Sequence, residues 1–439
     1  MSGFQREDTD EFARGARTFI VYPELPGRSA LSIDARLEEA KGLALAIGLD
    51  IIDTKHYRVR SPKASILLGG GQVQEIVDLI KSAEIELLIV DTNLTAIQQR
   101  NLEDRTGVKT IDRTGLILEI FGERAATAEG RLQVELAHLD YQAGRLVRSW
   151  THLERQRGGF GFLGGPGETQ IEADRRMIRD RMAKLRRELE EVKRTRTLHR
   201  DRRRRAPWPV IALVGYTNAG KSTLFNRLTN ANVVAENMLF ATLDPTMRQI
   251  DLRGIDKAIL SDTVGFVSDL PTQLIAAFRA TLEEVTTADI IIHVRDISHP
   301  ASDAQRDDVL SILRDLGSLD IGIGGIPIIE LWNKSDLIDE ERREYLQNLA
   351  ARNDDCMLVS AQTGEGVDTF LDFIAKRIAK NHQLRVINLD SSNGAALAWL
   401  HNKGEVRALS ENGEETNIEA LLSPQSWGQF EKLFGASIY

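Results

Sequence analysis

Residues 215–222 read GYTNAGKS, and this stretch decides the fold. It follows a short apolar run at 210–214 and precedes a helical-looking stretch at 223–228. The spacing G-x-x-x-x-G-K-S is that of a phosphate-binding loop. Glycines let the backbone curl until N–H groups face the β- and γ-phosphates, Lys221 adds a positive charge, and the Ser222 hydroxyl can hold Mg²⁺. The stretch predicts nucleotide binding by Gly215, Tyr216, Thr217, Asn218, Ala219, Gly220, Lys221, Ser222 and Thr223.

The composition is that of a globular protein with several domains. The chain has 439 residues, of which 42% are hydrophobic and 28% charged, values typical of soluble proteins. No apolar run approaches the roughly 18 residues that cross a bilayer, and the N-terminal stretch is too polar for a signal peptide. The single cysteine, Cys356, excludes an internal disulfide. The net charge of −9, taken alone, argues against nucleic acid, and no DNA partner is expected. We expect a cytoplasmic monomer that does not insert stably into a membrane.

Two units are expected ahead of the long helices. Residues 1–16 form a polar tail, and residues 17–122 alternate strand-like with helix-like stretches, which predicts a small parallel sheet with helices on its faces. The glycines at 69–71 favour a plain strand–helix turn, and an anion site there lacks a nearby lysine or acidic partner. The predicted strands are 19–25, 64–70, 86–94 and 108–113, and the predicted helices are 37–49, 73–83 and a third from residue 96.

Residues 123–205 are predicted to form an antiparallel helical hairpin. Apolar residues recur at alternating intervals of four and three between 132 and 153 and again between 171 and 192, which is the spacing of a coiled-coil seam. The connection at 157–168 holds six glycines and two phenylalanines. Its string GFGFLG matches a dinucleotide fingerprint, but no strand leads into it, so we interpret it as a tip with exposed aromatic rings.

The second hairpin helix is strongly basic. Between Asp174 and Arg205 there are fifteen Lys and Arg against six Asp and Glu, so this segment carries +9 in a chain of net charge −9. The basic end at 200–205 lies just before Pro207 and Pro209, a predicted hinge. A charge run is often only a solvated face. The charge of this segment is opposite in sign to the net charge of the chain, and the segment lies beside the aromatic tip. Both features favour a surface that binds RNA.

Residues 206–380 are predicted to form a doubly wound α/β domain around the phosphate loop, with ligands beyond the carboxyl ends of the strands. A small α+β domain at 381–439 would follow, and its function cannot be inferred from its sequence. The predicted strands are 249–253, 257–263, 289–296, 326–333 and 356–361, and the predicted helices include 270–285 and 367–380.

Three further motifs end predicted strands. The first, Asp262-Thr263-Val264-Gly265, offers a carboxylate for Mg²⁺ and a Gly265 N–H that can reach the γ-phosphate. In the second, Asn333-Lys334-Ser335-Asp336, the Asp336 carboxylate can accept from two N–H groups of guanine, Lys334 would lie over the base and Asn333 would brace the loop. In the third, the backbone of Ser360 and Ala361 is placed to meet guanine O6. Together these motifs predict that the nucleotide is GTP.

The whole chain resembles the HflX family of ribosome-associated GTPases over residues 18–380. The residues that carry this resemblance are 165–170 (GPGETQ), 174–176, 240–244 (FATLD), 262–267, 112–114, 116–121 and 132–136. The resemblance implies a Mg²⁺-dependent GTPase of the cytoplasm that binds the large ribosomal subunit and its RNA and can separate stalled or idle ribosomes, notably under stress. It implies catalytic roles for Lys221, Thr242 and Gly265, and Mg²⁺ ligands at Ser222, Thr242 and Asp262. It adds nucleotide contacts at Phe240, Ala241, Thr242, Leu243, Asp244 and Gln362.

The chain departs from the family pattern at two places, and one further position bears on hydrolysis. The glycine turn reads Gly-Gly-Gly-Gln-Val at 69–73 where a lysine is usual, which disfavours a second, ATP-type site. The hairpin tip is also richer in Phe and Gly than usual. Phe266 follows Gly265 where many small GTPases have a glutamine, and its ring cannot hydrogen-bond the attacking water, so slow intrinsic hydrolysis is expected.

Two alternative functions stay open at this stage. The chain could be an ATP-dependent RNA-remodelling protein that uses its N-terminal domain, or a membrane-associated GTPase whose hairpin lies on lipid. The Asn-Lys-x-Asp motif favours guanine over adenine. The narrow apolar seam of the hairpin disfavours the lipid hypothesis, because an interfacial helix needs a broad apolar face.

Overall fold

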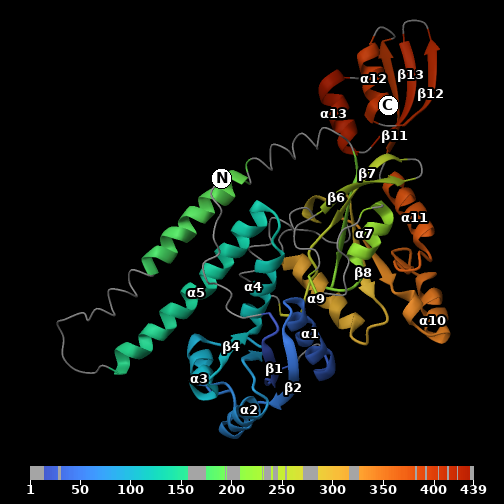
Figure 1. Cartoon of the computed structure of the whole chain (residues 1–439). Coiled ribbons are helices and arrows are strands. Elements are labelled where there is room, and N and C mark those ends of the chain that lie inside the picture. Colours follow the sequence, from blue (N-terminus) through green and yellow to red (C-terminus); the bar gives the residue numbers. More distant parts are fainter. Residues whose placement is uncertain are drawn as a thin grey trace.

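The computed structural model describes residues 14–27, 31–156, 175–192, 194, 208–229, 231, 239–240, 246–252, 255–269, 285–315, 326–380, 383–390, 393–403, 405–412, 415–422 and 424–435. These residues form three units, each built on one β-sheet, and a pair of long helices between the first two units (Figure 1). The predicted fold class, a doubly wound phosphate-loop domain with a smaller parallel α/β unit and a helical hairpin before it and an α+β unit after it, is confirmed.

The N-terminal unit is a four-stranded sheet of order β2-β1-β3-β4, in which all neighbouring strands are parallel. Ser32, Thr95 and Asp112 each accept a backbone N–H from the first turn of the helix that follows, and these caps fix where α1, α3 and α4 begin. The elements are β1 (Arg17–Glu24), α1 (Ile33–Ala46), β2 (Asp50–Arg58), α2 (Gly70–Ser82), β3 (Leu87–Val90), α3 (Ala96–Thr106), β4 (Lys109–Asp112) and α4 (Arg113–Arg124).

The strand predicted at 64–70 is wrong. The chain turns tightly there, because Lys63 and Leu67 exchange backbone hydrogen bonds of 3.1 and 2.9 Å and Leu67 has a left-handed φ of 65°. The glycines at 69–71 accordingly open α2 and do not end a strand. The second strand is instead β2, at the outer edge of the sheet, where Tyr57 is the one buried residue of the nine. A mostly polar edge strand shows little alternation of apolar with polar residues, so its sequence predicts a strand only weakly.

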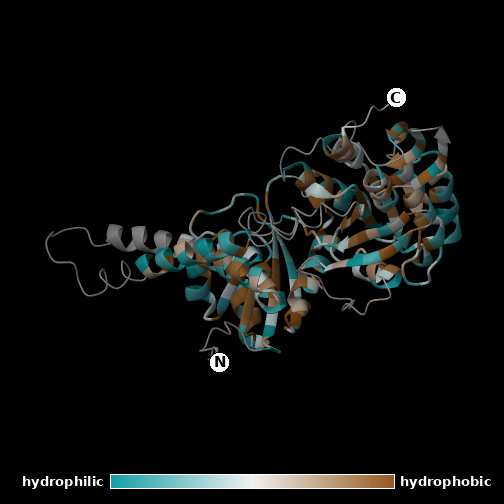
Figure 2. Cartoon of the chain, turned by 90° about the horizontal axis from the view of Figure 1, so that it is seen from above, coloured by the Kyte–Doolittle hydropathy of each residue, from teal (hydrophilic) through white to brown (hydrophobic). Residues whose placement is uncertain are grey.

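Two helices form the predicted hairpin. Helix α5 (Ala128–Gln156) and the helix of residues 175–192 lie side by side and project from the rest of the molecule (Figures 1 and 2). The guanidinium of Arg181 pairs with Glu135 across the two helices at 2.6 Å. The predicted seam of the second helix is buried at Met182, Leu185 and Leu189.

The unit that contains the phosphate loop is a six-stranded sheet of order β10-β9-β8-β5-β7-β6, parallel except for β6. The phosphate loop leaves the carboxyl end of β5, at the position where the strand order turns from one direction to the other. The elements are β5 (Val210–Gly215), α7 (Lys221–Thr229), β6 (Thr246–Leu252), β7 (Ile255–Asp262), η1 (Val285–Thr287), β8 (Ile290–Asp296), α9 (Ser302–Asp315), β9 (Ile328–Asn333), η2 (Ser335–Leu337), α10 (Glu340–Ala350), β10 (Cys356–Leu358) and α11 (Val367–Lys380).

The C-terminal unit is a three-stranded antiparallel sheet of order β11-β13-β12 with two helices. Its core gathers Ile387, Leu400, Trp427 and Phe430, all of them buried. The elements are β11 (Gln383–Asp390), α12 (Gly394–Lys403), β12 (Glu405–Asn412), β13 (Glu415–Leu422) and α13 (Pro424–Phe434).

One hydrophobic cluster joins the N-terminal unit to the unit that contains the phosphate loop. It contains Ile20 and Phe121 from the first unit and Phe240, Phe266 and Ile291 from the second. The rings of Phe121 and Phe240 meet edge to face, with centroids 4.7 Å apart. Figure 2 shows hydrophobic residues concentrated within the two units, whereas the described part of the hairpin is largely hydrophilic. The unit that contains the phosphate loop is therefore packed directly against the N-terminal unit.

Several predicted features lie outside the described residues. They are the hairpin tip at 157–168, the basic end at 200–205, the threonine-bearing segment at 241–244 and the helix predicted at 270–285 except for Val285, which lies in η1. Among the helices that the structure describes, none has the length and apolar character needed to cross a membrane.

Candidate nucleotide site

The phosphate loop curls tightly around the end of β5. Gly220 has a left-handed φ of 95°, and a Cβ there would lie 2.1 Å from the Asn333 side-chain nitrogen. At Gly265 a Cβ would lie 2.9 Å from Thr217 Cα and 3.1 Å from Lys221 Nζ. Gly220 needs glycine because of its left-handed backbone and the nearby Asn333 side chain, and Gly265 because the Thr217 backbone lies too close for a side chain. The phosphate loop and the Asp262–Gly265 motif are thus brought together as predicted.

Lys221 is buried inside this loop. Its ammonium donates to the carbonyl oxygens of Gly215 at 3.1 Å and Tyr216 at 2.9 Å. Burial lowers the pKa of Lys221 to about 8, although the nearby Asp262 carboxylate favours the charged form. The positive charge is thus fixed within the cradle of the loop, where a phosphate would compensate the cost of its burial.

Ser222 and Asp262 meet beside the lysine. The Ser222 hydroxyl donates to Asp262 Oδ2 at 2.8 Å, and Asp262 ends β7 next to Leu213 of β5. Hydroxyl and carboxylate oxygens are the ligands that Mg²⁺ prefers, so this pair fits a magnesium site. The third predicted ligand, Thr242, lies outside the described residues together with Ala241, Leu243 and Asp244. Phe240 is described, and its ring packs on Phe121 in the shared core.

The two loops predicted to read guanine are tied to the phosphate loop by one side chain. Asn333 donates to the Ala219 carbonyl at 2.8 Å, and its amide oxygen accepts from the Ala361 N–H at 2.8 Å. The Ser360 hydroxyl donates to Asp336 Oδ1 at 2.5 Å. Asn333 therefore braces the site as predicted, and Asp336 is oriented by the neighbouring loop.

The side chain of Lys334 forms an ion pair with a carboxylate at the end of the adjacent strand. Lys334 has a left-handed φ of 66°, and its ammonium pairs with Asp296 Oδ2 at 2.7 Å. Asp296 ends β8, so this ion pair joins two adjacent strand ends of the sheet. The stem of Lys334 is held across the edge of the sheet where the guanine loops lie.

Two arginines that the sequence did not point to support the same loops. Arg227 of α7 donates to the Ala361 carbonyl at 2.6 Å and the Gln362 carbonyl at 2.5 Å. Arg343 of α10 donates to the Ser335 carbonyl at 2.9 Å. No spacing in the sequence indicates either contact, because each depends on where a helix passes a loop that is distant in the chain.

A second unpredicted feature connects the N-terminal unit to the phosphate loop. The carboxylate of Glu39 on α1 accepts from the Tyr216 hydroxyl, from the Ser268 hydroxyl and, at 2.6 Å, from Arg113. Burial would raise the pKa of Glu39, but the Arg113 charge and the two hydroxyl donors lower it below its ordinary value. Arg36 adds a bond of 2.6 Å to Ser268. The segment that follows Gly265 is thus held by charged groups of the N-terminal unit.

Phe266 takes no part in this polar network through its side chain. The ring is 1% exposed within the shared core, and its backbone pairs with the phosphate loop through Phe266 N to Gly215 O at 3.1 Å and Thr217 N to Phe266 O at 2.7 Å. The side chain packs in the core and offers no group to an attacking water.

Comparison with known proteins identifies the family. Successive parts of the chain match the models described as GTP-binding GTPase N-terminal (residues 34–122), GTP-binding GTPase Middle Region (124–203), 50S ribosome-binding GTPase (210–334) and HflX C-terminal domain (345–437). GTPase HflX of Magnetococcus marinus is 47% identical over 395 residues, which are 90% of this chain and 90% of the relative. The chain belongs to the HflX family of GTPases. GTPase HflX of Escherichia coli is 40% identical over 353 residues, 80% of this chain and 81% of that protein.

As an HflX-family member, the chain binds and hydrolyses GTP, which confirms the predicted enzyme class and the predicted nucleotide. A crystal structure of a GTP-binding protein from Sulfolobus solfataricus in complex with GDP is 24% identical and covers 82% of this chain and 99% of that chain, with a TM-score of 0.44.

Proposed function

We propose that this HflX-family GTPase binds the large ribosomal subunit and its RNA and uses the GTP state to separate or rescue ribosomes. Its GTPase unit matches the model described as 50S ribosome-binding GTPase over residues 210–334. The segment from Asp174 to Arg205 carries a charge of +9 on a chain that is otherwise acidic, as expected of an RNA-facing surface. The observation that carries the nucleotide half of the proposal is Asn333, which binds the phosphate loop and the guanine loops at once.

The roles in the nucleotide site follow from the contacts described above. We assign the phosphates to the loop from Gly215 to Thr223, with Lys221 as the fixed positive charge. Asp336 would accept from the guanine N–H groups, Lys334 would lie along the base, and the backbone of Ser360, Ala361 and Gln362 would meet its O6 edge. The Gly265 N–H would bind the γ-phosphate, because the close approach of Gly265 to Lys221 brings both to the same place.

Ser222, Thr242 and Asp262 are the proposed ligands of Mg²⁺. The bound ion would offset negative charge on the β- and γ-phosphates. The contact between Ser222 and Asp262 supports two of these ligands, and Thr242 rests on the family motif at 240–244.

Hydrolysis transfers the γ-phosphoryl group to water, breaking the bond to the β-phosphate oxygen and releasing GDP and phosphate. Lys221 and the Gly265 N–H stabilise the charge that spreads over the γ-phosphate oxygens. Phe266 cannot orient the water, so the isolated protein should be slow and the large subunit should accelerate it. An acceleration of ~10³-fold would correspond to about 4 kcal/mol of transition-state stabilisation.

The decisive experiment is co-sedimentation with purified large subunits in the presence of a non-hydrolysable GTP analogue or GDP, followed by light scattering of 70S particles. We expect binding with the analogue only, and dissociation of 70S particles by the full chain. Neutralising the four arginines at 202–205 should weaken binding and flatten its salt dependence, by about one log unit of slope for each RNA phosphate that these arginines neutralise. Equal binding with both nucleotides, or intact 70S particles at saturating protein, would refute the proposal.

A further inference from the structure

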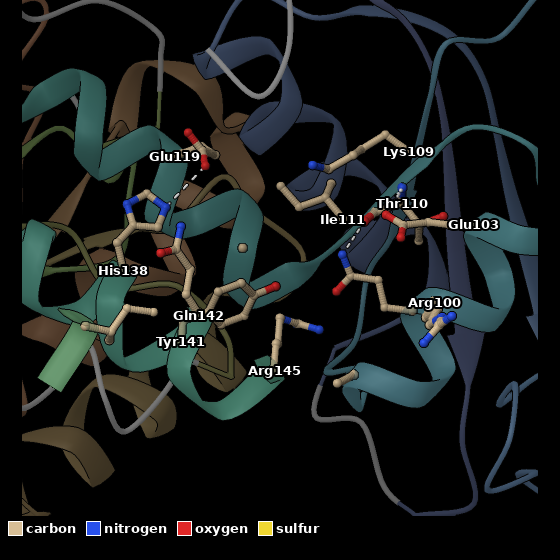
Figure 3. Close-up of a pocket in the computed structure, with 14 residues that line it drawn as sticks. Arg100, Glu103, Lys109, Thr110, Ile111, Glu119, His138, Tyr141, Gln142 and Arg145 are labelled. Carbon is tan, nitrogen blue, oxygen red and sulfur yellow. Dashed lines mark hydrogen bonds and ion pairs between the residues drawn. The ribbon is translucent and has the colours of Figure 1, made fainter. Parts of the chain in front are cut away.

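A cavity lies in the N-terminal half of the chain, away from the phosphate loop. It has a volume of about 460 Å³ and is lined by residues of α3, β4, α4 and α5 and by Ile178 of the second hairpin helix (Figure 3). Figure 3 shows His138, Tyr141, Gln142 and Arg145 on one side, all from α5, and Thr110, Glu103 and Arg100 on the other. The guanidinium of Arg145 points from α5 toward the opposite wall. A cavity of this size accommodates a small organic molecule.

Arg145 is held rigidly at this cavity. Its terminal nitrogen donates to Asp112 Oδ2 at 2.8 Å, and its guanidinium lies 3.9 Å from the centre of the Tyr141 ring. The Tyr141 hydroxyl donates to Asp112 Oδ1 at 2.6 Å. The same carboxylate also accepts two backbone N–H groups, from Leu94 at 3.0 Å and Gly115 at 2.9 Å. Asp112 is thus fully satisfied by four donors, and the remaining N–H groups of Arg145 are free to serve another acceptor.

Four buried polar atoms of residues that line this cavity have no hydrogen-bond partner among the described residues. They are Arg145 Nε, Arg145 Nη1, Gln99 Oε1 and Thr110 Oγ1. Thr110 is fully buried, and its hydroxyl has neither donor nor acceptor within the described chain. Native proteins rarely leave buried polar atoms unpaired, and several at one cavity indicate that something else occupies it.

The unpaired atoms define the chemistry of the occupant. A guanidinium N–H group favours a carboxylate as its acceptor, and the Gln99 oxygen needs an N–H donor. The Thr110 hydroxyl can donate to the carboxylate of the ligand or accept from its N–H group. The wall is nearly neutral, because Arg100, Lys109 and Arg145 face Glu103 and Glu119, and so it disfavours a highly charged polyphosphate. We propose that this cavity binds a small carboxylate that also carries an N–H donor.

Such a ligand would bridge two parts of the fold. Gln99 belongs to α3 and Thr110 to β4, both in the N-terminal unit, whereas Arg145 belongs to α5 of the hairpin. Binding therefore favours the arrangement in which α5 sits against β4, and it should raise the melting temperature of the full chain.

Three probes of nearly equal size test the proposal: succinamate, which carries one carboxylate and one amide, succinate with two carboxylates, and succinamide with two amides. Titration calorimetry on the full-length, GDP-loaded protein should give a dissociation constant for succinamate at least tenfold lower than for either of the other two. Arg145→Gln should weaken succinamate binding by tenfold or more. Equal affinities for the three probes, tighter binding of inorganic phosphate than of succinamate, or no saturable binding would overturn the assignment and leave a water-filled cavity.

A second pair of variants protects the test against loss of folding in Arg145→Gln. Thr110→Val removes the unpaired hydroxyl without changing the shape of the side chain, so the melting temperature should stay the same or rise while succinamate binds about fivefold more weakly. Thr106→Val is the matched control, because the Thr106 hydroxyl donates to the Leu102 carbonyl at 2.8 Å and does not line the cavity. The melting temperature of Thr106→Val should be lower than that of the unmodified protein, and its affinity for succinamate should be the same. Unchanged binding in Thr110→Val would refute the site.

Discussion

Replacing Arg113 by methionine tests the contact between the N-terminal unit and the GTPase unit. The Arg113 side chain is 1% exposed, and its guanidinium pairs with Asp91 and Glu39, each at 2.6 Å, and donates to the Ser268 carbonyl at 2.8 Å. Methionine is a long, apolar replacement for the side-chain stem but leaves two carboxylates, 1% and 7% exposed, without this partner. Removing one member of a buried ion pair costs about 3–5 kcal/mol, because the other charge stays buried. We expect the free energy of unfolding of the N-terminal unit to fall by that amount.

Urea unfolding should be followed by hydrogen exchange at the backbone amides of β3 and β4, because a chain of several units need not unfold in one step. The control is Arg14→Met, whose side chain is 80% exposed and lies 3.5 Å from Glu123. Exposed pairs of this kind contribute about 1 kcal/mol or less. Adding Glu39→Gln to Arg113→Met should recover part of the loss, because an amide needs no counter-charge. A loss in Arg113→Met no larger than in the control would refute the reasoning.

The pH dependence gives an independent check on the same network. The folded-state pKa of Glu39 lies below its ordinary value of 4.5, since Arg113 and two hydroxyl donors outweigh the effect of burial. A carboxyl group of this kind stabilises the fold fully above its unfolded pKa, and the stabilisation is lost as the pH falls through the folded pKa. In Arg113→Met, protonation of the buried Glu39 carboxylate instead stabilises the fold, because the neutral acid needs no counter-charge. The difference in unfolding free energy between the two proteins should therefore narrow below about pH 4.5.

Three further outcomes follow from the site. Asp336→Asn should lose affinity for GTP and gain affinity for xanthosine triphosphate, whose C2 carbonyl accepts from the amide; equal GTP affinity in a filter-binding assay would remove the assignment. Arg227→Met removes hydrogen bonds of 2.6 and 2.5 Å to the Ala361 and Gln362 carbonyls and should weaken GDP binding about tenfold by calorimetry. Unchanged affinity would show that the loop needs no such support. Phe266→Ala should cost about 3–5 kcal/mol of stability through a cavity in the core, whereas Phe266→Leu should keep single-turnover hydrolysis within a few-fold. A large loss in the leucine variant would give the ring a role in the chemistry.

The phosphate loop and the guanine motifs could be predicted from the sequence because their chemistry resides in short, contiguous stretches. A loop such as Asn333–Asp336 ends a strand and acts largely through its own backbone and side chains, so its spacing carries the information. The parallel sheets and the hairpin were also predictable, since their apolar periodicities differ from one another.

The remaining elements and supporting residues depend on tertiary contacts, which the spacing of residues in the sequence does not indicate. Helix α4 was not among the predicted elements, because residues 116–118 and 120–121 are buried on all sides and show no amphipathic period. Strand β2 lies at a polar edge, and the apolar run at 64–70 fills the core from a turn. Glu39 and Arg227 act on loops that are far from them in the chain, so only the folded arrangement assigns them a role.

Asp112 and Arg113 are consecutive, yet their side chains serve different neighbours. The Asp112 carboxylate is bonded to Tyr141 and Arg145 of α5, and the Arg113 guanidinium is bonded to Ser268 beyond the Gly265 motif. One planar peptide unit therefore separates the root of the hairpin from the nucleotide-binding segment. Helix α5 has 29 residues and is about 43 Å long, and Asp112 holds it near its middle, at Tyr141 and Arg145. A displacement of the far end of α5 would therefore act on Asp112 and, through the next residue, on the bonds that Arg113 makes to Ser268 and Glu39 beside the phosphate loop.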